Sequence, residues 1–276
     1  MKDRRSPNQA PRQPGQDVRL IILHATVGSA ASALGWLTNP DSRVSTHYLI
    51  EKAGPTWRLV GEDAIAFSDG DDYAAVASIE QVATYQDPAL LRRAWRLPVA
   101  ARYAAGRYEF QANASFCGPT SVANLLRSIG RDATQRQVVD GTAYEPWFGV
   151  LPGGLTLDQL GDLLQQRSGR PVQVVRDVDL AQFRAHLRRA NDPRRRYLVN
   201  FHRGPLFGRG HGHFSPVLGY LEAEDLVLVG DVNAEYRPFL VASERLWRGT
   251  DTVDAATGLE RGLLWIELVP GDESPR

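Results

Sequence analysis

The 276-residue chain is 43% hydrophobic and 23% charged, and its 32 basic and 32 acidic side chains leave a formal net charge of zero. This is the composition of a soluble globular protein that can bury a full core, and the zero net charge argues against a nucleic-acid or membrane-surface partner. A single cysteine excludes an internal disulfide and a thiolate-rich metal centre, and it suits a reducing compartment.

Residues 1–17, MKDRRSPNQAPRQPGQD, form a polar stretch that is rich in proline and arginine. Such a composition predicts a disordered tail. The stretch has no apolar core of a secretory signal, and no later run is long enough to span a membrane. We therefore expect a cytoplasmic protein without a membrane partner.

The pattern of residues 18–70 predicts a small segment of mixed α and β structure. RLIILHATVGS predicts a buried strand and turn, SAASALGWLTNP a short helix, and VSTHYLIEKAGPTWRLVGED a hairpin that turns near Gly54 and Pro55. These blocks resemble the first part of the N-acetylmuramoyl-L-alanine amidase family, zinc enzymes that cut the link between glycan and peptide in bacterial cell walls. By this resemblance, His24 falls on the first zinc-ligand position and His47 on a His-Tyr strand motif.

The amidase-like pattern stops after Gly70, before the distal ligands that complete the metal site of that family. Catalytic zinc generally takes three protein ligands. We therefore predict a partial α/β segment in which both histidines are ordinary strand residues and no metal is bound. Because a partial sheet leaves an edge and an apolar face to cover, the segment either packs on the rest of the chain or stays poorly ordered.

From residue 71 the pattern becomes helical. ALLRRAWRLPVAARYAAG has apolar residues at helical spacing, interrupted by a proline. Further along, Thr156 is placed to cap a helix, VQVV predicts a short strand, and residues 179–189 predict another helix. His186 on that helix reads as a surface residue. The three arginines at 194–196 read as a solvated turn before the strand YLVNFH.

The only cysteine lies in the stretch FQANASFCGPTSVANLL, residues 110–126. The apolar spacing predicts a helix that stops near Gly130, and Pro119 fits its first turn, where a missing N–H costs nothing. Cys117 then occupies the helix N-terminus, where free N–H groups and the helix dipole stabilise a thiolate. Gln111 carries an amide donor that can complete an oxyanion hole with the Cys117 backbone. The alternative is a buried structural thiol.

Two segments far downstream carry residues that favour catalysis over that alternative. GHGHFSPV contains His213, and the apolar run LVLVGDVN leads to Asp231. Both segments read as strands, and on neighbouring strands of one sheet the two side chains can lie together. With Cys117 facing them from a helix, they would supply a general base and the group that orients it for a cysteine nucleophile.

From about residue 83 to 269 the chain resembles phytochelatin synthase, a papain-like cysteine transferase that acts on glutathione. The matching blocks keep the order and spacing of the family: FQANASFCGPTSVANLL, NFHRG, GHGHFSPVLGY, DVNAEYRP and LWRGTDTVDAATGLERG. The papain signature around the cysteine is absent, so the link to papain lies in the roles of the residues. The resemblance implies an α+β, papain-like cysteine protease fold, in which the helix of the nucleophile packs on an antiparallel sheet that bears histidine and aspartate.

The resemblance also implies a role for each site residue. Cys117 becomes the nucleophile and His213 the base. Asp231 becomes the orienting partner of the base, and Gln111 the oxyanion donor. These are the same roles that the residue types suggest by themselves.

Three further residues are assigned to substrate binding. By the resemblance, Asp254 and Arg261 hold the α-amino and α-carboxylate groups of the γ-glutamyl moiety; by themselves they would read as a surface ion pair. Arg203, with Arg209, is expected to flank the mouth of the cleft, where positive charge would attract the two carboxylates of glutathione. A solvent-facing arginine is the alternative for both.

The implied reaction cleaves the Cys-Gly bond of glutathione through a thioester on Cys117 and passes the γ-glutamylcysteinyl group to glutathione or water. No protein cofactor is implied, and a metal ion would arrive bound to the thiolate of glutathione, as in heavy-metal detoxification. Plant members add a Cys-rich C-terminal region linked to metal response, whereas this chain stops soon after Val269. The expectation is a short-form bacterial enzyme in which hydrolysis is favoured, and a homodimer is left open.

The predicted division is a tail over residues 1–17, the amidase-like segment over 18–70, the catalytic domain over 71–270 and a tail over 271–276. Three alternatives to the transferase remain. A papain-like peptidase would act on another substrate, and a zinc-dependent cell-wall amidase would need the missing ligands. A non-catalytic glutathione-binding protein would tolerate loss of Cys117.

Overall fold

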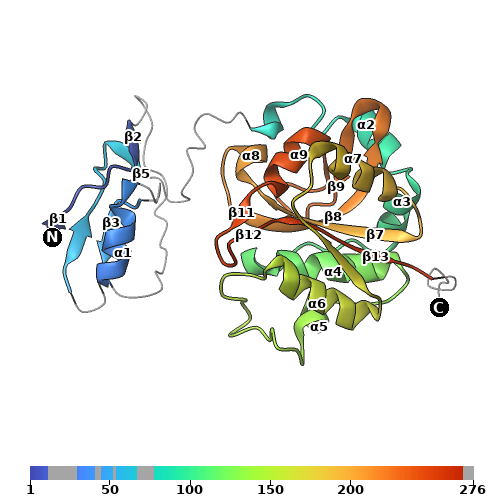
Figure 1. Ribbon diagram of the computed structural model, residues 1–276, viewed down its shortest axis with the longest axis horizontal. Helices are drawn as coiled ribbons and strands as arrows, with labels where there is room; N and C mark the ends of the chain where they lie inside the picture. Colours follow the sequence, from blue (N-terminus) through green and yellow to red (C-terminus); the bar gives the residue numbers. More distant parts are fainter. Residues whose placement is uncertain (12–29, 41–44, 52–53, 67–77, 270–276) are drawn as a thin grey trace. The chain divides into compact units, whose positions relative to one another are not determined.

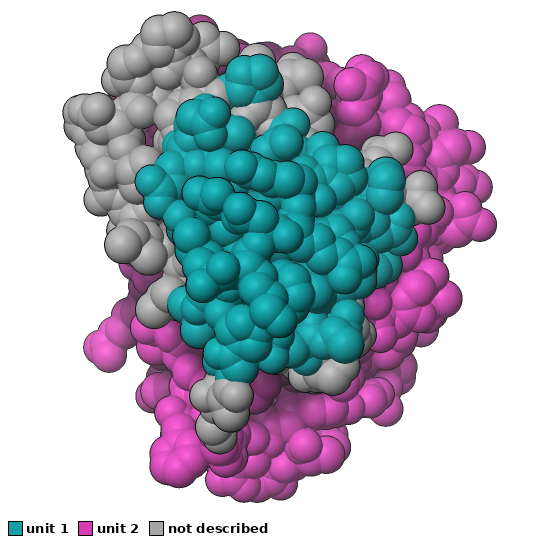
Figure 2. Space-filling model, turned by 90° about the vertical axis from the view of Figure 1, so that its left-hand side faces the viewer, with its two compact units in different colours: residues 1–75 teal, residues 76–276 magenta. Residues whose placement is uncertain are grey.

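The computed structural model describes residues 1–11, 30–40, 45–51, 54–66 and 78–269. The chain divides into two compact units, Met1–Ala75 and Val76–Arg276 (Figure 1), and Figure 2 colours them separately. Among the helices of the described residues, none is long and apolar enough to cross a membrane.

The described residues of unit 1 form two short sheets and one helix. β3 (Tyr48–Ile50) pairs antiparallel with β4 (Thr56–Arg58), which is the predicted hairpin, and β1 (Lys2–Asp3) lies parallel to β4. β2 (Gln9–Pro11) pairs with β5 (Ala64–Ala66). The helix α1 (Ala30–Leu37) falls within the predicted helical stretch. Its apolar face and the strands enclose a small core: Ala33, Leu34, Leu37, Leu49 and Leu59.

The first residues of unit 1 differ from the disordered tail that their composition suggests. Residues 2–3 and 9–11 are strands, and the Ser6 N–H donates to the Leu59 carbonyl at 2.8 Å. A partial sheet has unpaired N–H and C=O groups at its edges, and the N-terminal backbone satisfies some of them. Residues 12–17 of the expected tail lie outside the described residues, as does His24.

Unit 2 is organised around a six-stranded sheet in the order β10-β9-β8-β7-β13-β6, and every neighbouring pair in it is antiparallel. The sheet consists of β6 (Val172–Val175), β7 (Arg195–His202), β8 (Gly212–Leu221), β9 (Leu226–Val229), β10 (Phe239–Ala242) and β13 (Gly262–Glu267). β11 (Val253–Asp254) and β12 (Leu259–Glu260) form a separate two-stranded hairpin. β7 and β8, the long strands, lie at the centre.

Helices cover both faces of this sheet (Figure 1). The first face carries α2 (Pro88–Ala94), α3 (Pro98–Ala105), α4 (Cys117–Ser128), α5 (Gln135–Val139) and α6 (Leu157–Ser168). The second carries α7 (Leu180–Arg189), α8 (Gly204–Phe207) and α9 (Ser243–Thr250). Because strand side chains alternate, Leu198 of β7 enters the first core and Val199 enters the second. Burial on both faces explains why β9 reads as a continuous apolar run.

Local sequence signals set the ends of several helices as predicted. Thr156 caps α6, with its side chain accepting from the Gln159 N–H and the Gln159 side chain reaching back to the Thr156 backbone. The same capping box at Asp179 starts α7. Pro98 begins α3 instead of breaking a longer helix, since proline fits the first turn.

The arginine run at 194–196 is not a solvated turn. β7 begins at Arg195, and the Arg196 side chain is fully buried. Its Nε donates to the Ser128 hydroxyl at 2.9 Å, and its Nη1 donates to the Pro193 carbonyl at 2.8 Å. Ser128 is the last residue of α4, so the guanidinium lies at the negative end of that helix dipole. The helix that bears the cysteine is thereby fixed to the sheet at its far end.

The α+β class and the antiparallel sheet under the cysteine-bearing helix are confirmed. α4 packs on β8, the strand that carries His213, and Asp231 follows β9, the next strand of the sheet. This is the papain-like arrangement that the sequence predicts.

Candidate active site

Cys117 is the first residue of α4, and a short 3-10 turn over Ala114–Phe116 leads into it. The turn is capped by Asn113, whose side chain accepts from the Ser115 N–H at 3.0 Å. Pro119 lies in the first turn of the helix, as predicted. The cysteine is buried, and its thiol shares hydrogen bonds with the His213 imidazole and the Phe214 backbone. The sulfur therefore faces the start of β8.

His213 lies on β8 opposite Phe201 of β7 and is almost fully buried. The Phe201 ring packs edge-on against the imidazole, with the ring centroids 5.6 Å apart. The imidazole Nε2 bonds to Asp231 Oδ1 at 3.0 Å. The imidazole thus has one nitrogen on the carboxylate and Nδ1 left for the thiol of Cys117, which is the arrangement of a cysteine, histidine and aspartate triad.

Asp231 lies two residues beyond the end of β9 and is fully buried. Its Oδ1 accepts from the Asn233 N–H at 2.8 Å as well as from His213. Arg203 Nη2 donates to both carboxylate oxygens, at 2.9 and 2.8 Å. The hydrogen-bonded series therefore runs through four residues, Cys117, His213, Asp231 and Arg203.

The site shifts the pKa of the thiol and the imidazole in opposite directions. Burial by itself raises the pKa of Cys117, but the hydrogen bond and charge of His213, the Phe214 N–H and a nearby guanidinium outweigh it, so the pKa is lowered. Burial and Arg203 lower the pKa of His213, yet the charge and hydrogen bond of Asp231 and the bond to Cys117 raise it above its ordinary value. Together these shifts favour a thiolate and imidazolium pair.

Asp231 stays ionised in spite of its burial. Desolvation raises the pKa of this carboxyl, and the charges of His213 and Arg203 with the hydrogen bonds from His213 and Asn233 lower it below its ordinary value. The carboxylate is therefore held as an anion beside the imidazole.

Gln111 lies on the segment that leads to Cys117, and its N–H donates to the Val232 carbonyl at 2.8 Å, one residue beyond Asp231. The side-chain Oε1 is buried and has no hydrogen-bond partner in the part of the chain that the structure describes. This oxygen can only accept a hydrogen bond, so the predicted oxyanion role would fall to the Nε2 donor of the same side chain.

Side chains of α4 and α5 hold the segment around Gln111, which belongs to no strand. Asn124 donates to the Glu109 carbonyl and accepts from the Glu109 N–H, both at 2.8 Å. Gln135 accepts from the Ala112 N–H at 2.8 Å and donates to the Phe110 carbonyl at 3.1 Å. Sequence reasoning did not single out Asn124 or Gln135; their position on the helices flanking the FQANASFC block is the only signal of this role.

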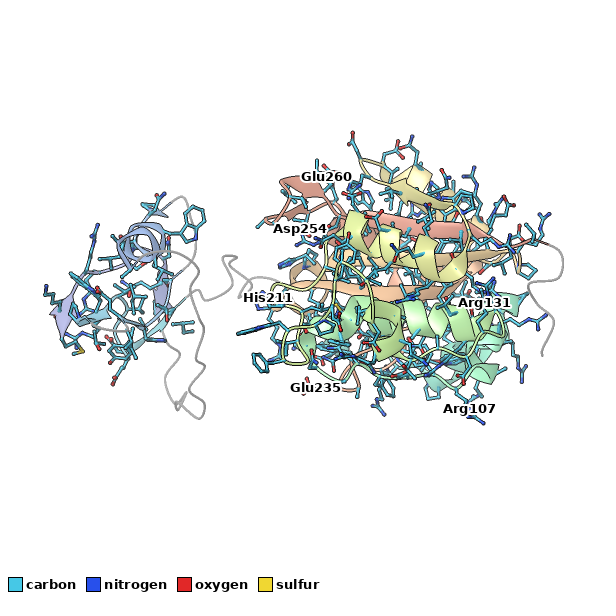
Figure 3. The ribbon with its side chains drawn as sticks, turned by 90° about the horizontal axis from the view of Figure 1, so that it is seen from below. Arg107, Arg131, His211, Glu235, Asp254 and Glu260 are labelled. Carbon is cyan, nitrogen blue, oxygen red and sulfur yellow. The ribbon has the colours of Figure 1, made fainter. Side chains whose placement is uncertain are left out.

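Asp254 and Arg261 meet at the β11-β12 hairpin, with Arg261 Nη2 4.0 Å from Asp254 Oδ1. The Arg261 side chain is buried, and its Nη1 donates to the Val253 carbonyl at 2.7 Å. Figure 3 labels Asp254 and Glu260 on this hairpin, at the same end of unit 2 as His211. The guanidinium lies against Gly212, where an added Cβ would be 3.0 Å from Nη2. The Arg261 guanidinium therefore lies against the residue that precedes His213.

Arg203 is not a residue at the mouth of a cleft. It is 6% exposed, and its guanidinium is bound to Asp231 and stacked on Tyr236, with the guanidinium carbon 3.9 Å from the ring centroid. Gly210, at φ +101°, gives it room, since a Cβ there would lie 2.9 Å from Arg203 Cβ. The NFHRG block contains this arginine, but no local pattern shows that a carboxylate 28 residues away is its partner.

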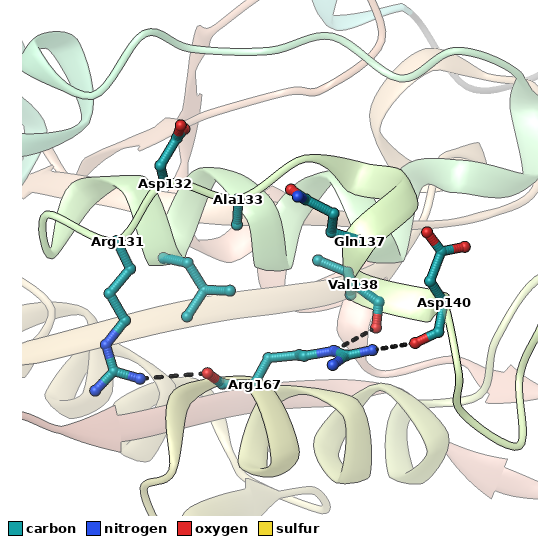
Figure 4. Close-up of a pocket in the computed structure, with 8 residues that line it drawn as sticks. Arg131, Asp132, Ala133, Gln137, Val138, Asp140 and Arg167 are labelled. Carbon is teal, nitrogen blue, oxygen red and sulfur yellow. Dashed lines mark hydrogen bonds between the residues drawn. The ribbon is translucent and has the colours of Figure 1, made fainter.

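A surface pocket of about 390 Å³ lies away from these residues, beside the C-terminal part of α4 (Figure 4). Its two arginines brace the surrounding backbone. Arg131 Nη1 donates to the Ser168 carbonyl at 2.6 Å, and Arg167 Nε donates to the Val138 carbonyl at 2.9 Å. The residues that line it are Leu126, Arg131, Asp132, Ala133, Gln137, Val138, Asp140 and Arg167, and none of them belongs to the catalytic series.

In unit 1, the ring Nε2 of His47 lies 3.0 Å from the Ala64 carbonyl. Among the residues that the structure describes, no group of three or more histidine, cysteine, aspartate or glutamate side chains gathers where a metal ion could be held. The described residues therefore do not fit a zinc centre.

Comparisons with known proteins match both units. A family model described as N-acetylmuramoyl-L-alanine amidase matches residues 14–118, which continues beyond the segment at 18–70 that the sequence suggests. The peptidase domain of Streptococcus ComA is a similar solved structure, at 15% identity and a TM-score of 0.40, covering 58% of this chain and 97% of that one.

Two curated plant proteins named glutathione gamma-glutamylcysteinyltransferase are similar over 173 residues. The wheat (Triticum aestivum) protein is 31% identical over 58% of this chain and 34% of its own length. A Lotus japonicus protein is 29% identical over 58% of this chain and 36% of its own length. The chain therefore spans about a third of the length of these relatives. A family model described as phytochelatin synthase matches residues 78–263, well over half of the sequence, and the chain belongs to the phytochelatin synthase family.

Proposed function

We propose that the chain is a glutathione γ-glutamylcysteinyltransferase, a cysteine-dependent acyltransferase whose acyl-enzyme also reacts with water. The observation that carries this proposal is the buried, hydrogen-bonded series of Cys117, His213 and Asp231 at the start of α4. Membership of the family and the names of the plant relatives support the choice of glutathione as substrate.

In the first half-reaction, the Cys117 thiolate attacks the carbonyl carbon of the Cys-Gly bond, and a C–S bond forms as the carbonyl oxygen becomes an oxyanion. The Gln111 amide and the Cys117 N–H donate hydrogen bonds to that oxygen. The His213 imidazolium gives its proton to the glycine nitrogen, the C–N bond breaks and glycine leaves. A γ-glutamylcysteinyl thioester remains on Cys117.

In the second half-reaction, neutral His213 takes a proton from the incoming nucleophile. Attack by the amine of a second glutathione releases the Cys117 thiolate and yields a phytochelatin that is one γ-glutamylcysteine unit longer. Attack by water yields γ-glutamylcysteine instead. Asp231 keeps the imidazole oriented through both steps, since its Oδ1 holds Nε2.

Asp254 and Arg261 are proposed to select the γ-glutamyl end of the substrate. A carboxylate and a guanidinium side by side complement an α-amino and an α-carboxylate group. Arg261 lies against Gly212, the residue before His213, and in this proposal a substrate held by the pair presents a nearby carbonyl to Cys117.

Several finer points belong to the same proposal. Metal ions would enter as part of the substrate, bound to the thiolate of glutathione. A cytoplasmic location suits both glutathione and a reduced catalytic thiol. The catalytic domain is placed at residues 71–270, with the amidase-like segment as an appended unit, and a homodimer stays open.

The test is incubation of the purified protein with glutathione, with and without cadmium, followed by mass spectrometry of the products and of the intact protein. We expect free glycine and a γ-glutamylcysteinyl adduct on Cys117. Longer oligomers would identify a synthase, and γ-glutamylcysteine alone a hydrolase. Cys117→Ser should abolish both signals, whereas Ser115→Ala, two residues earlier, should keep them.

A second substrate separates this activity from a general papain-like peptidase. The isomer α-Glu-Cys-Gly has the same composition but places its amino and carboxylate groups differently. We expect glycine release from glutathione to exceed release from this isomer by at least tenfold, and Asp254→Asn to shrink the difference. Equal cleavage of both peptides would favour a peptidase, and absence of glycine and adduct in every condition would overturn the glutathione proposal.

A further inference from the structure

We infer that Arg203 is a positioning residue of the catalytic site, which fixes the Asp231 carboxylate and through it the His213 ring. This inference deepens the proposed function and rests on it for the reaction. The first observation is the set of contacts at the carboxylate. Oδ1 of Asp231 accepts from His213, Asn233 and Arg203, whereas among the described residues only Arg203 reaches Oδ2. Without Arg203, no other described residue would donate a hydrogen bond to Oδ2.

The second observation is that Arg203 itself has little freedom. It precedes α8, and its N–H donates to the His211 carbonyl at 3.0 Å. Its guanidinium carbon lies 3.9 Å from the Tyr236 ring centroid and 5.3 Å from that of Phe207. Gly210 closes the other side, because its backbone lies so near that a Cβ would be 3.2 Å from Arg203 Cδ. A donor that is itself held in place keeps its acceptor in one orientation, whereas a flexible donor does not.

The third observation favours positioning over a simpler role in substrate binding. The guanidinium is almost fully buried, and its charge faces the Asp231 carboxylate, so it is neutralised where it lies. A side chain that recognises the carboxylates of a substrate needs its fork open toward that substrate. The Phe201 ring packs against both Arg203 and His213. Its centroid lies 5.8 Å from the Arg203 guanidinium carbon and 5.6 Å from the His213 ring centroid.

Arg203 also acts on the charge balance of the series. The charged groups that act on His213 are Cys117 from α4, Asp231 after β9 and Arg203 before α8. Arg261 lies against the neighbouring Gly212. Tyr85 and Tyr108, whose pKa burial raises, lie near Asp231 as neutral groups. The positive charge of Arg203 lowers the pKa of both Cys117 and His213. Its removal would therefore raise both values.

The experiment compares Arg203→Met and Arg203→Lys, with Arg248→Met as the matched control on the exposed face of α9. Two readouts are used: kcat and KM for glycine release from glutathione, and the pH dependence of Cys117 alkylation by iodoacetamide. For Arg203→Met we expect a 10- to 100-fold lower kcat, the range for removal of a group that orients a site residue, with KM changed less than about threefold. The alkylation profile should move to higher pH.

Arg203→Lys should recover part of the lost kcat. Only one guanidinium nitrogen, Nη2, contacts the two carboxylate oxygens, so a single ammonium can take its place. If Arg203→Met fails to fold, Tyr236→Leu removes the stacking partner while the carboxylate contact stays, and it should shift the profile in the same direction by less.

Two outcomes would overturn the inference. A raised KM with unchanged kcat and an unchanged alkylation profile would make Arg203 a substrate ligand. An unchanged kcat in Arg203→Met would remove it from the site. The alkylation readout needs no glutathione, so a failure of the proposed substrate and a failure of the Arg203 inference give different results.

Discussion

Gly212 and Arg261 are packed so closely that a methyl group at position 212 would lie 3.0 Å from Nη2 and 3.1 Å from Nε of the arginine. Because His213 follows directly, this contact places Arg261, one of the proposed substrate-binding residues, against the residue before the proposed catalytic histidine. Each of the two glycines of the GHGH motif thus packs against one arginine: Gly210 against Arg203 and Gly212 against Arg261.

We expect Gly212→Ala to raise KM for glutathione about three- to tenfold with a smaller effect on kcat, because the added methyl group displaces Arg261 and leaves Cys117 and Asp231 in place. Steady-state glycine release measures both constants. Gly161→Ala is the control, since a Cβ at that helical position meets its nearest neighbour at 3.5 Å, an ordinary contact. A selective loss of kcat in Gly212→Ala would show that the methyl group disturbs the triad instead.

Alkylation of Cys117 should stay fast well below pH 8.5, about the ordinary pKa of a thiol. The lowered pKa of Cys117 and the raised pKa of His213 both favour the thiolate and imidazolium pair, and acid removes the pair as the thiolate protonates. His213→Ala removes the hydrogen bond and charge that lower the pKa of Cys117, whereas the burial that raises this pKa remains. We expect its alkylation rate at pH 7 to fall at least tenfold, measured by mass spectrometry. An unchanged rate would mean that the helix terminus alone activates the thiol.

Asp231→Ala should destabilise the protein by about 3–5 kcal/mol at pH 7, because it leaves the Arg203 guanidinium buried without its carboxylate. The folded-state pKa of Asp231 is lowered, so its contribution is present above the ordinary carboxyl pKa and is lost as pH falls through the folded value. The difference in the free energy of unfolding between Asp231→Ala and the wild type should therefore become smaller at low pH. Urea unfolding at pH 5 and about pH 3, which is below the ordinary carboxyl pKa of about 3.9, tests this, and a difference that does not shrink at pH 3 would contradict it.

Gln111→Leu should lower kcat by about 10²–10³, the usual cost of removing one oxyanion donor. The alkylation rate of Cys117 gives an internal control, because that reaction forms no oxyanion and the triad does not include Gln111. We expect it to change less than twofold. Equal losses in glycine release and alkylation would show that the substitution disturbs Cys117 itself, through the Val232 contact of the same segment.

Phe148→Gly should raise the free energy of unfolding by about 1 kcal/mol, since Phe148 is 88% exposed and held at φ +47°, a left-handed conformation that costs a side chain with a Cβ. Phe148→Ala keeps that cost and should give no gain. The turn is tied to the catalytic segment, because Asn113 Nδ2 donates to the Gly149 carbonyl at 3.1 Å. Loss of activity together with the gain in stability would identify the aromatic ring as functional.

Local patterns in the sequence determined the helices and strands whose positions depend on residues close to them in the chain. Pro119 after Cys117 marked the start of α4, and Thr156 marked the start of α6. The periodicity of the later segments placed His213 on a strand and Asp231 at the end of another. The conformational preference of each residue and the need to bury an apolar face act over a few residues, so a reader of the sequence can use them.

Only the tertiary structure decided which groups pair over a distance. Arg196 read as part of a solvated turn and Arg203 as a residue at the mouth of the cleft, yet Arg196 is buried at the end of α4 and Arg203 at Asp231. The polar residues of the N-terminus read as a tail, yet Lys2 lies opposite Trp57 in a sheet. A charged side chain looks the same in the sequence whether it meets water or a carboxylate. Which one it meets depends on strand order and register, and these are set by packing across the whole unit.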